Sequence, residues 1–161
     1  MAKLTINITV NDKKYEKTIN PNLLLVDFIR EELKLTGTHV GCDTSQCGAC
    51  MVMLNGRAVK SCSILLAQLN NQEIKTIENL EKNDELHPMQ EAFRNNHGLQ
   101  CGFCTPGMII SAISLVNEND NPDEDEIRKH IEGNFCRCTG YQNIIKSISE
   151  GAKNMKDLEN N

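Results

Sequence analysis

The chain has 161 residues, which is enough for one medium-sized domain or two small ones. Its formal net charge is -5 and its seventeen basic residues are scattered, which argues against nucleic-acid binding, because a phosphate-binding surface needs clustered Lys and Arg. The N-terminus lacks the pattern of a secretory signal and no apolar run approaches the roughly 18 residues that cross a bilayer, so we expect a cytoplasmic protein without a transmembrane segment.

The first part of the chain predicts a small mixed sheet crossed by one helix. Apolar and polar residues alternate over 4–10, which is the period of a half-buried strand, and 15–19 can return beside it after a turn. Residues 23–33 carry apolar side chains at helical spacing, with Asn22 placed to cap the helix. A last short strand is expected over 73–77.

A second hairpin is predicted around Asn55-Gly56. Two short apolar runs flank this dipeptide between Ala49 and Cys62. Asn-Gly is the strongest short hairpin signal, because both central positions of such a turn require a positive φ.

The second part of the chain predicts four short helices. Pro88 and Pro106 suit first helical turns, where a missing N–H does no harm, and the Asn-Pro-Asp sequence at 121–123 caps a helix that begins with acidic residues. Helices this short are marginal alone, so a buried metal centre would help to hold them together. The expected helices cover residues 88–97, 106–119, 124–133 and 141–155, and the last ten residues of the chain are expected to fray.

The eight cysteines fall into two groups of four. A polar, charged stretch over 70–86 separates the groups and is of the kind that connects compact units. We therefore predict two domains, residues 1–79 and residues 80–161. Because structural disulfides are unusual in a reducing cytoplasm, the thiols are better explained as metal ligands.

The first cysteine group has the spacing C-x4-C-x2-C with a distant fourth cysteine. This is the plant-type [2Fe-2S] pattern, and we expect one tight loop to supply three ligands and an adjacent strand end to supply the fourth. A structural zinc site is the alternative, but zinc sites usually present two separated C-x2-C pairs and this group has one. The predicted ligands are Cys42, Cys47, Cys50 and Cys62.

The second cysteine group combines a C-x2-C pair with a distant C-x-C pair. Each pair lies next to the start of a predicted helix, where the helix dipole and free N–H groups favour negative thiolates. This spacing fits a zinc site as well as an iron–sulfur cluster, so the residues alone leave both open. The predicted ligands are Cys101, Cys104, Cys136 and Cys138.

Four motifs together resemble the small iron–sulfur subunit of the molybdenum hydroxylases, the xanthine dehydrogenase and aldehyde oxidoreductase family. They are GCDTSQCGAC, VKSC, HGLQCGFCTPGMI and GNFCRCTGYQNI, and the resemblance covers roughly residues 3 to 150. It implies an α+β chain in which an N-terminal ferredoxin-like β-grasp domain and a C-terminal four-helix domain each carry one [2Fe-2S] cluster. It also implies that all eight cysteines are ligands.

The resemblance further implies partner subunits and a path for electrons. A large subunit would bind molybdopterin, as the cytosine dinucleotide, next to the cluster of the helical domain. A medium subunit would bind FAD next to the ferredoxin-type cluster, and the assembly would be a dimer of heterotrimers. Electrons would leave the molybdenum centre and reach the flavin through both clusters.

Within that family the chain is most similar to the small chain of aerobic carbon monoxide dehydrogenase. The motifs CDTSQCGAC, VKSC and HGLQCGFCTPGMI carry this similarity. Related xanthine, aldehyde or N-heterocycle hydroxylases are the alternative, because the large subunit selects the substrate. A free-standing two-cluster ferredoxin and a zinc-stabilised interaction module are the other hypotheses that we consider.

Two residues stand out beside the cysteines. Many family members carry Gly where this chain has Ser45, and a positive φ at that position would cost a serine about 1 kcal/mol. Gln100 directly precedes a cluster cysteine, and the resemblance implies that it donates to or accepts from the pterin of the partner. The alternative is that Gln100 caps a helix end.

The chain itself is predicted to move electrons rather than to make bonds. Eight thiolates saturate two clusters, and the sequence contains no dinucleotide fingerprint, phosphate-cradling loop or nucleophile with its base. We therefore predict no catalytic residue. The four histidines, expected at the surface or as helix caps rather than as ligands, are His39, His87, His97 and His130.

Overall fold

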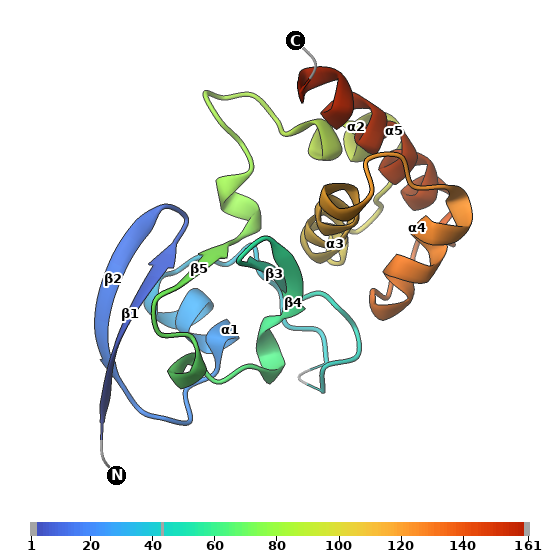
Figure 1. The fold of residues 1–161 in the computed structure, drawn as a ribbon. Coiled ribbons are helices and arrows are strands. Elements are labelled where there is room, and N and C mark those ends of the chain that lie inside the picture. The colour runs from blue at the N-terminus through green and yellow to red at the C-terminus, as the bar shows by residue number, and fades with distance from the viewer. Residues whose placement is uncertain (1–2, 43, 160–161) are drawn as a thin grey trace.

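The computed structural model describes residues 3–42 and 44–159. Its N-terminal half contains a five-stranded sheet in the order β2-β1-β5-β3-β4, with the short helix α1 packed on it (Figure 1). β1 pairs in parallel with β5 and antiparallel with β2, so the predicted mixed sheet is confirmed. The strands are β1 (Leu4–Val10), β2 (Lys13–Ile19), β3 (Met51–Leu54), β4 (Arg57–Lys60) and β5 (Gln72–Lys75).

Both predicted hairpins are confirmed, and both turn through two residues with positive φ. Asn11 and Asp12 join β1 to β2 with φ of 49° and 65°. Asn55 and Gly56 join β3 to β4 with φ of 47° and 85°. This is the backbone twist that matches the twist of antiparallel strands.

The last strand lies one to two residues earlier than the predicted range 73–77. β5 ends at Lys75 because the N–H of Thr76 donates to Oδ1 of Asn11 at 2.9 Å instead of to a neighbouring strand. The chain then leaves the sheet as a 3₁₀ turn, Ile77–Asn79.

The predicted helix over 23–33 begins later and is less regular than expected. Leu24 is extended and forms a β-bridge with Leu65, so its backbone cannot begin the helix. Asn22 therefore does not cap it. The element consists of α1 (Leu25–Asp27) followed by a π-helical turn, Phe28–Glu32.

The apolar side of this segment faces the sheet as predicted. Phe28 and Ile29 are completely buried and belong to the same core as Ile8, Val52 and Ile74 of the strands. This core holds the N-terminal half together.

The C-terminal half contains the four predicted helices. His87 caps α2 through a reciprocal pair of hydrogen bonds with Met89 and Gln90, and Asp123 caps α4 in the same way with Glu126. Within the described residues, none of the helices has the length and apolar character needed to cross a bilayer. The helices are α2 (Pro88–Asn95), α3 (Thr105–Glu118), α4 (Glu124–His130) and α5 (Gln142–Glu159).

α5 is longer than predicted and extends into the tail that was expected to fray. Gly151 packs so closely on α2 that a Cβ at that position would lie 2.5 Å from Sδ of Met89. Lys156 forms an ion pair of 2.8 Å with Asp120. These contacts hold the last turns of the helix, and residues 160 and 161 lie outside the described part of the chain.

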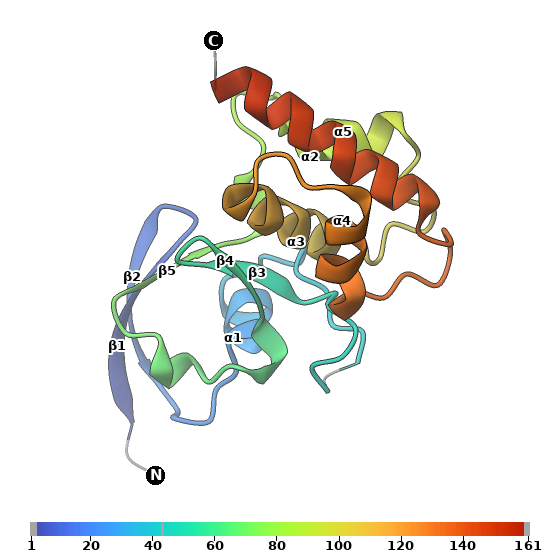
Figure 2. The ribbon, with the colours of Figure 1, turned by 45° about the vertical axis from the view of Figure 1, so that its right-hand side comes forward.

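Helix α3 joins the two halves of the molecule. Every residue from Gly107 to Val116 is buried, and Met53 of β3 belongs to the core that α3 forms with the other helices. Oγ of Ser114 accepts a hydrogen bond from the N–H of Ala58 in β4 at 3.0 Å. Figure 2 shows α3 between the sheet and α5. The N-terminal end of α3 is therefore fixed relative to the sheet.

The cysteine-rich loop before β3 has the strained residue that the sequence indicated. Ser45 has a φ of 59°, in the left-handed region that favours glycine. Its carbonyl accepts from Nζ of Lys60 at 2.9 Å, and its hydroxyl donates to Oγ of Ser63 at 3.1 Å. The structure thus meets the condition under which a serine at this position costs free energy.

We predict that Ser45→Gly stabilises the chain. Relief of the left-handed conformation contributes about 1–2 kcal/mol, which exceeds the roughly 0.4–1 kcal/mol that a glycine adds to the entropy of the unfolded chain. Chemical denaturation measures the difference. Ser63→Ala is the control for the hydroxyl contact: it leaves residue 45 unchanged and removes the Ser45–Ser63 hydrogen bond, together with the one that Ser63 donates to the carbonyl of Lys60. A loss of stability in Ser45→Gly would contradict the strain.

Candidate metal centres

The first cysteine group is formed by the loop before β3 and the turn after β4. The N–H groups of Gln46 and Cys47 donate to the sulfur of Cys42 at 3.4 Å and 3.3 Å. The thiols of Cys50 and Cys62 are buried next to each other. The group is therefore two pairs of thiols, Cys42 with Cys47 and Cys50 with Cys62.

Ser61 holds the second of these pairs together. Its backbone N–H and its hydroxyl both donate to the carbonyl of Cys50, at 3.2 Å and 2.7 Å. Ser61 is completely buried and directly precedes Cys62. The hairpin β3–β4 thus returns Cys62 to the loop that carries the other three thiols.

The thiols of the first group differ in their acidity. Backbone hydrogen bonds, from Cys47 above all and also from Thr44 and Gln46, lower the pKa of Cys42 to about 6. Burial raises the pKa of Cys50 to about 11. Because the thiolate is the form that binds metals, Cys42 is a preformed ligand at neutral pH, whereas Cys50 needs the charge of a cation beside it.

The second cysteine group brings together residues from two loops on either side of α3 and α4. The sulfurs of Cys101 and Cys138 lie 3.5 Å apart, and both residues are exposed. Cys104, the N-cap residue of α3, has its thiol against that of Cys136. This group too consists of two pairs of thiols.

Electrostatics in the second group follow burial and hydrogen bonding. Burial raises the pKa of Cys104 to about 12. Burial is the largest influence on the pKa of Cys136 and acts to raise it, but hydrogen bonds from Thr139, Cys138 and Cys104 together outweigh burial. The Thr139 hydroxyl donates to the sulfur at 3.1 Å. The net effect lowers the pKa of Cys136, so this pair combines a more acidic thiol, Cys136, with a less acidic one, Cys104.

The donor set suits a two-metal cluster. Soft thiolates in two pairs fit a [2Fe-2S] cluster, in which four cysteines serve two irons. Within residues 3–42 and 44–159, no three His, Cys, Asp or Glu side chains converge as ligands on a single ion position. The backbone N–H groups that point at the Cys42 sulfur also suit a metal ligand, because such hydrogen bonds stabilise the charge of a thiolate.

The two cysteine groups lie close together in the fold. The ring of His39, just before the first group, stacks on that of Phe103 in the second, with 4.7 Å between ring centroids. Nδ1 of His39 donates to the carbonyl of Phe103 at 2.7 Å. The carbonyl of Cys47 accepts a hydrogen bond of 2.8 Å from the N–H of Phe135. Sequence reasoning treated His39 as an isolated surface histidine and missed this contact.

The other residues considered from the sequence are placed as follows. Gln100 is exposed in the loop before Cys101. It occupies no cap position, because the C-cap of α2 is Asn96 and the N-cap of α3 is Cys104. The histidines were expected either at the surface or as helix caps, and His87 is the N-cap of α2. Its pKa is lowered by burial and by the charge of Lys82.

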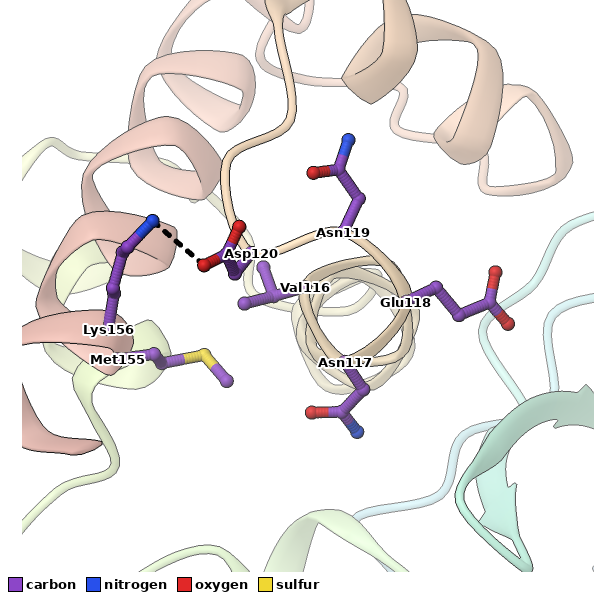
Figure 3. Close-up of a pocket in the computed structure, with 7 residues that line it drawn as sticks. All are labelled: Val116, Asn117, Glu118, Asn119, Asp120, Met155 and Lys156. Carbon is purple, nitrogen blue, oxygen red and sulfur yellow. Dashed lines mark ion pairs between the residues drawn. The ribbon is translucent and has the colours of Figure 1, made fainter. Parts of the chain in front are cut away.

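A separate hollow of about 560 Å³ lies at the other end of α3, the C-terminal end (Figure 3). Figure 3 shows Lys156 pointing toward Asp120, and the ion pair between them closes one side. The predicted site residues do not contribute to it. Its lining consists of Val116, Asn117, Glu118, Asn119, Asp120, Met155 and Lys156.

Comparison with protein families matches both halves of the chain. Residues 8–86 match the 2Fe-2S iron-sulfur cluster binding domain, and residues 76–149 match the [2Fe-2S] binding domain. The predicted domain boundary between residues 79 and 80 falls inside the overlap of the two matches and stays a prediction.

Individual proteins are similar over nearly the whole chain. Caffeine dehydrogenase subunit gamma of Pseudomonas sp. (strain CBB1) is 45% identical, over 92% of this chain and 90% of its own length. The structure of quinoline 2-oxidoreductase from Pseudomonas putida 86 superposes with a TM-score of 0.91 at 39% identity, covering 96% of this chain and 97% of that one.

A third similarity is to part of a longer enzyme. Aldehyde oxidoreductase from Desulfovibrio gigas superposes with a TM-score of 0.92 at 36% identity, covering 96% of this chain but only 17% of that chain. The same pair of folds thus occurs both as a separate subunit and as one segment of a larger polypeptide. This chain belongs to the small [2Fe-2S] subunits of the molybdenum hydroxylase family: it contains two [2Fe-2S]-binding domains and is an electron-transfer subunit of oxidoreductase complexes.

Proposed function

We propose that each group of four thiols holds one [2Fe-2S] cluster. Such a cluster supplies reversible one-electron transfer when bound. The observation that carries the assignment is the arrangement of each group as two pairs of adjacent thiols, including the 3.5 Å separation of the Cys101 and Cys138 sulfurs. The proposed sets are Cys42, Cys47, Cys50 and Cys62 for one cluster, and Cys101, Cys104, Cys136 and Cys138 for the other.

The exposed side of the second group is proposed to face a molybdopterin-binding subunit. Cys101 and Cys138 are the exposed thiols, and the rings of Phe103 and Phe135 beside them are 48% and 60% exposed. Apolar surface of this kind next to a redox centre fits a face that a partner covers. Gln100 lies on the same loop, where its amide can bind a polar cofactor held by that partner.

The first group is then proposed to deliver electrons to a subunit that binds FAD. Electrons would enter at the Cys101 and Cys138 edge and leave from the loop around Cys42. A dimer of such three-subunit units, with the cytosine dinucleotide form of molybdopterin in the large subunit, is the assembly that we propose for the complex. The chain contributes the two domains, proposed as 1–79 and 80–161.

For the substrate of the complex we propose an N-heterocycle rather than carbon monoxide. Caffeine and quinoline, which give two of the similar proteins their names, are both nitrogen heterocycles. An aldehyde is the second candidate, because the similar enzyme from Desulfovibrio gigas is an aldehyde oxidoreductase. Carbon monoxide was expected from motif similarity alone.

Reciprocal substitutions test the ligand sets. We expect the reduced protein to give two distinct [2Fe-2S] signals in electron paramagnetic resonance, because the two sets differ in exposure and hydrogen bonding. Cys138→Ala should remove one signal and Cys47→Ala the other, each with a matching loss of iron and acid-labile sulfide. Stoichiometric zinc in the purified protein, or loss of the same signal in both variants, would refute the assignment.

Substrate class is tested with the complete complex, purified with its partner subunits. We expect a nitrogen heterocycle to bleach the visible absorbance of the clusters under anaerobic conditions, since substrate oxidation places electrons on them. Aldehydes and carbon monoxide are the parallel samples. Bleaching by carbon monoxide alone would contradict this proposal and support the motif-based expectation that the complex oxidises carbon monoxide.

Gln100→Ala is predicted to slow reduction of the clusters by substrate in the complex while both cluster signals stay intact. The reason is that its amide would orient the cofactor of the partner without touching either set of thiols. Stopped-flow bleaching measures the rate, and Gln68→Ala is the matched control because Gln68 is an exposed glutamine in the N-terminal half. Equal rates in the two variants would remove Gln100 from the path.

A further inference from the structure

Three backbone segments meet where the two cysteine groups approach each other, and two glycines in them, Gly48 and Gly107, have no room for a Cβ. A Cβ on Gly107 would lie 2.2 Å from the carbonyl oxygen of Gly48. A Cβ on Gly48, which has a φ of 72°, would lie 2.5 Å from the carbonyl oxygen of Gly133. Real Cβ atoms do not approach other atoms this closely, so the seam depends on glycine in two segments.

Asn134 connects all three segments from inside this seam. Its side chain is buried, at 2% exposure, and Nδ2 donates to the carbonyls of Gly48 at 3.3 Å and Gly107 at 3.4 Å. Its own backbone is fixed by an N–H bond of 2.9 Å to the carbonyl of Ile131 and by the hydroxyl of Tyr141, which donates to its carbonyl. One amide group therefore links a sheet-domain loop, the first turn of α3 and the segment that leads to Cys136.

The seam also contains a direct connection between the two groups of thiols. The N–H of Phe135, the residue after Asn134, donates to the carbonyl of Cys47 at 2.8 Å. Phe135 is bonded to Cys136. Cys47 and Cys136 are thus joined by a path of covalent bonds interrupted by a single hydrogen bond.

We propose that Asn134 is a positioning residue that sets the separation of the two [2Fe-2S] clusters and keeps the Cys47–Phe135 hydrogen bond formed. The proposal rests on the ligand sets given above. Among the described residues the amide of Asn134 makes no hydrogen bond to a thiol; it instead holds the carbonyl of Gly48, the residue after Cys47, and the carbonyl of Gly107 in the first turn of α3. The rate of electron transfer between buried centres falls steeply with the distance between them. Functional groups must therefore be held within about 0.5 Å of their working geometry. A small opening of the seam would therefore weaken the coupling without changing either set of ligands.

The test uses the full chain with both clusters reduced by dithionite. Electron paramagnetic resonance reports the spin–spin interaction between the two clusters as line splitting or as faster spin relaxation, and this interaction also falls steeply with distance. We expect Asn134→Ala and Asn134→Leu to keep full iron, sulfide and the g-values of each cluster but to show a weaker interaction than the parent. Asn134→Leu keeps the branched shape and the number of side-chain heavy atoms and removes the donor. Asn117→Ala, an exposed asparagine on α3, should match the parent.

The possible outcomes separate this inference from the proposed function. An unchanged interaction in either Asn134 variant with both clusters present would overturn the positioning role. Loss of a cluster from both variants would also overturn it, because Asn134 would then act in holding a cluster. Two reduced clusters without any interaction in the parent would overturn the close approach itself. A parent without two [2Fe-2S] signals would instead refute the ligand sets.

Discussion

The structure depends on bringing thiols from distant segments into adjacent pairs while the backbone stabilises their negative charge. Four thiolates near each other repel, and burial raises the free energy of each charge. The chain offsets this cost at Cys42 with backbone N–H groups and at Cys136 with the hydroxyl of Thr139. Exposure of Cys101 and Cys138 reduces the cost at the outer edge of the second group. The remaining charge requires a cation, which the irons of a cluster supply.

Helix α3 gives the two groups a common frame. Its first turn carries Cys104 and contacts the loop of the first group through Gly107, while its middle packs against β3 and the other helices. A helix that is buried on all sides behaves as a core element rather than as a surface helix. The two domains therefore pack as partners around α3, with the clusters' loops at its N-terminal end. The scarcity of aromatic residues is balanced by isoleucine and methionine in this core.

The cysteines of this chain are all used in the two groups that α3 holds together. All eight cysteines belong to the two groups, so the chain has thiols for binding clusters and none left over for other chemistry. Its exposed cysteines lie beside exposed aromatic residues, and its buried ones, Cys50 and Cys62, pack with Val26 in the N-terminal half. In the complex that we propose, another subunit selects the substrate, which fits the similarity of this chain to proteins named for caffeine and for quinoline.

Local patterns in the sequence were sufficient for most of the elements. The Asn-Gly turn, the alternating strand at 4–10 and the capping signals of α2 and α4 depend on neighbouring residues only, and these predictions are confirmed. The helix near residue 25 was placed wrongly because a distant partner, Leu65, holds Leu24 in an extended conformation. The extra turn of α5 depends in the same way on a distant partner, because Lys156 pairs with Asp120.

The sequence by itself determined the cysteine spacing and the family, because motif order is a local property, whereas the positive φ of Ser45 is known only from the structure. Only the tertiary structure decided which thiols are neighbours, that His39 stacks on Phe103, and that Asn134 joins three segments. Asn134 lies two residues before Cys136 in the GNFCRC motif, which was a signal, but its partners Gly48 and Gly107 are far away in the chain. Contacts of that kind arise only when packing brings backbones together, and no local pattern encodes them.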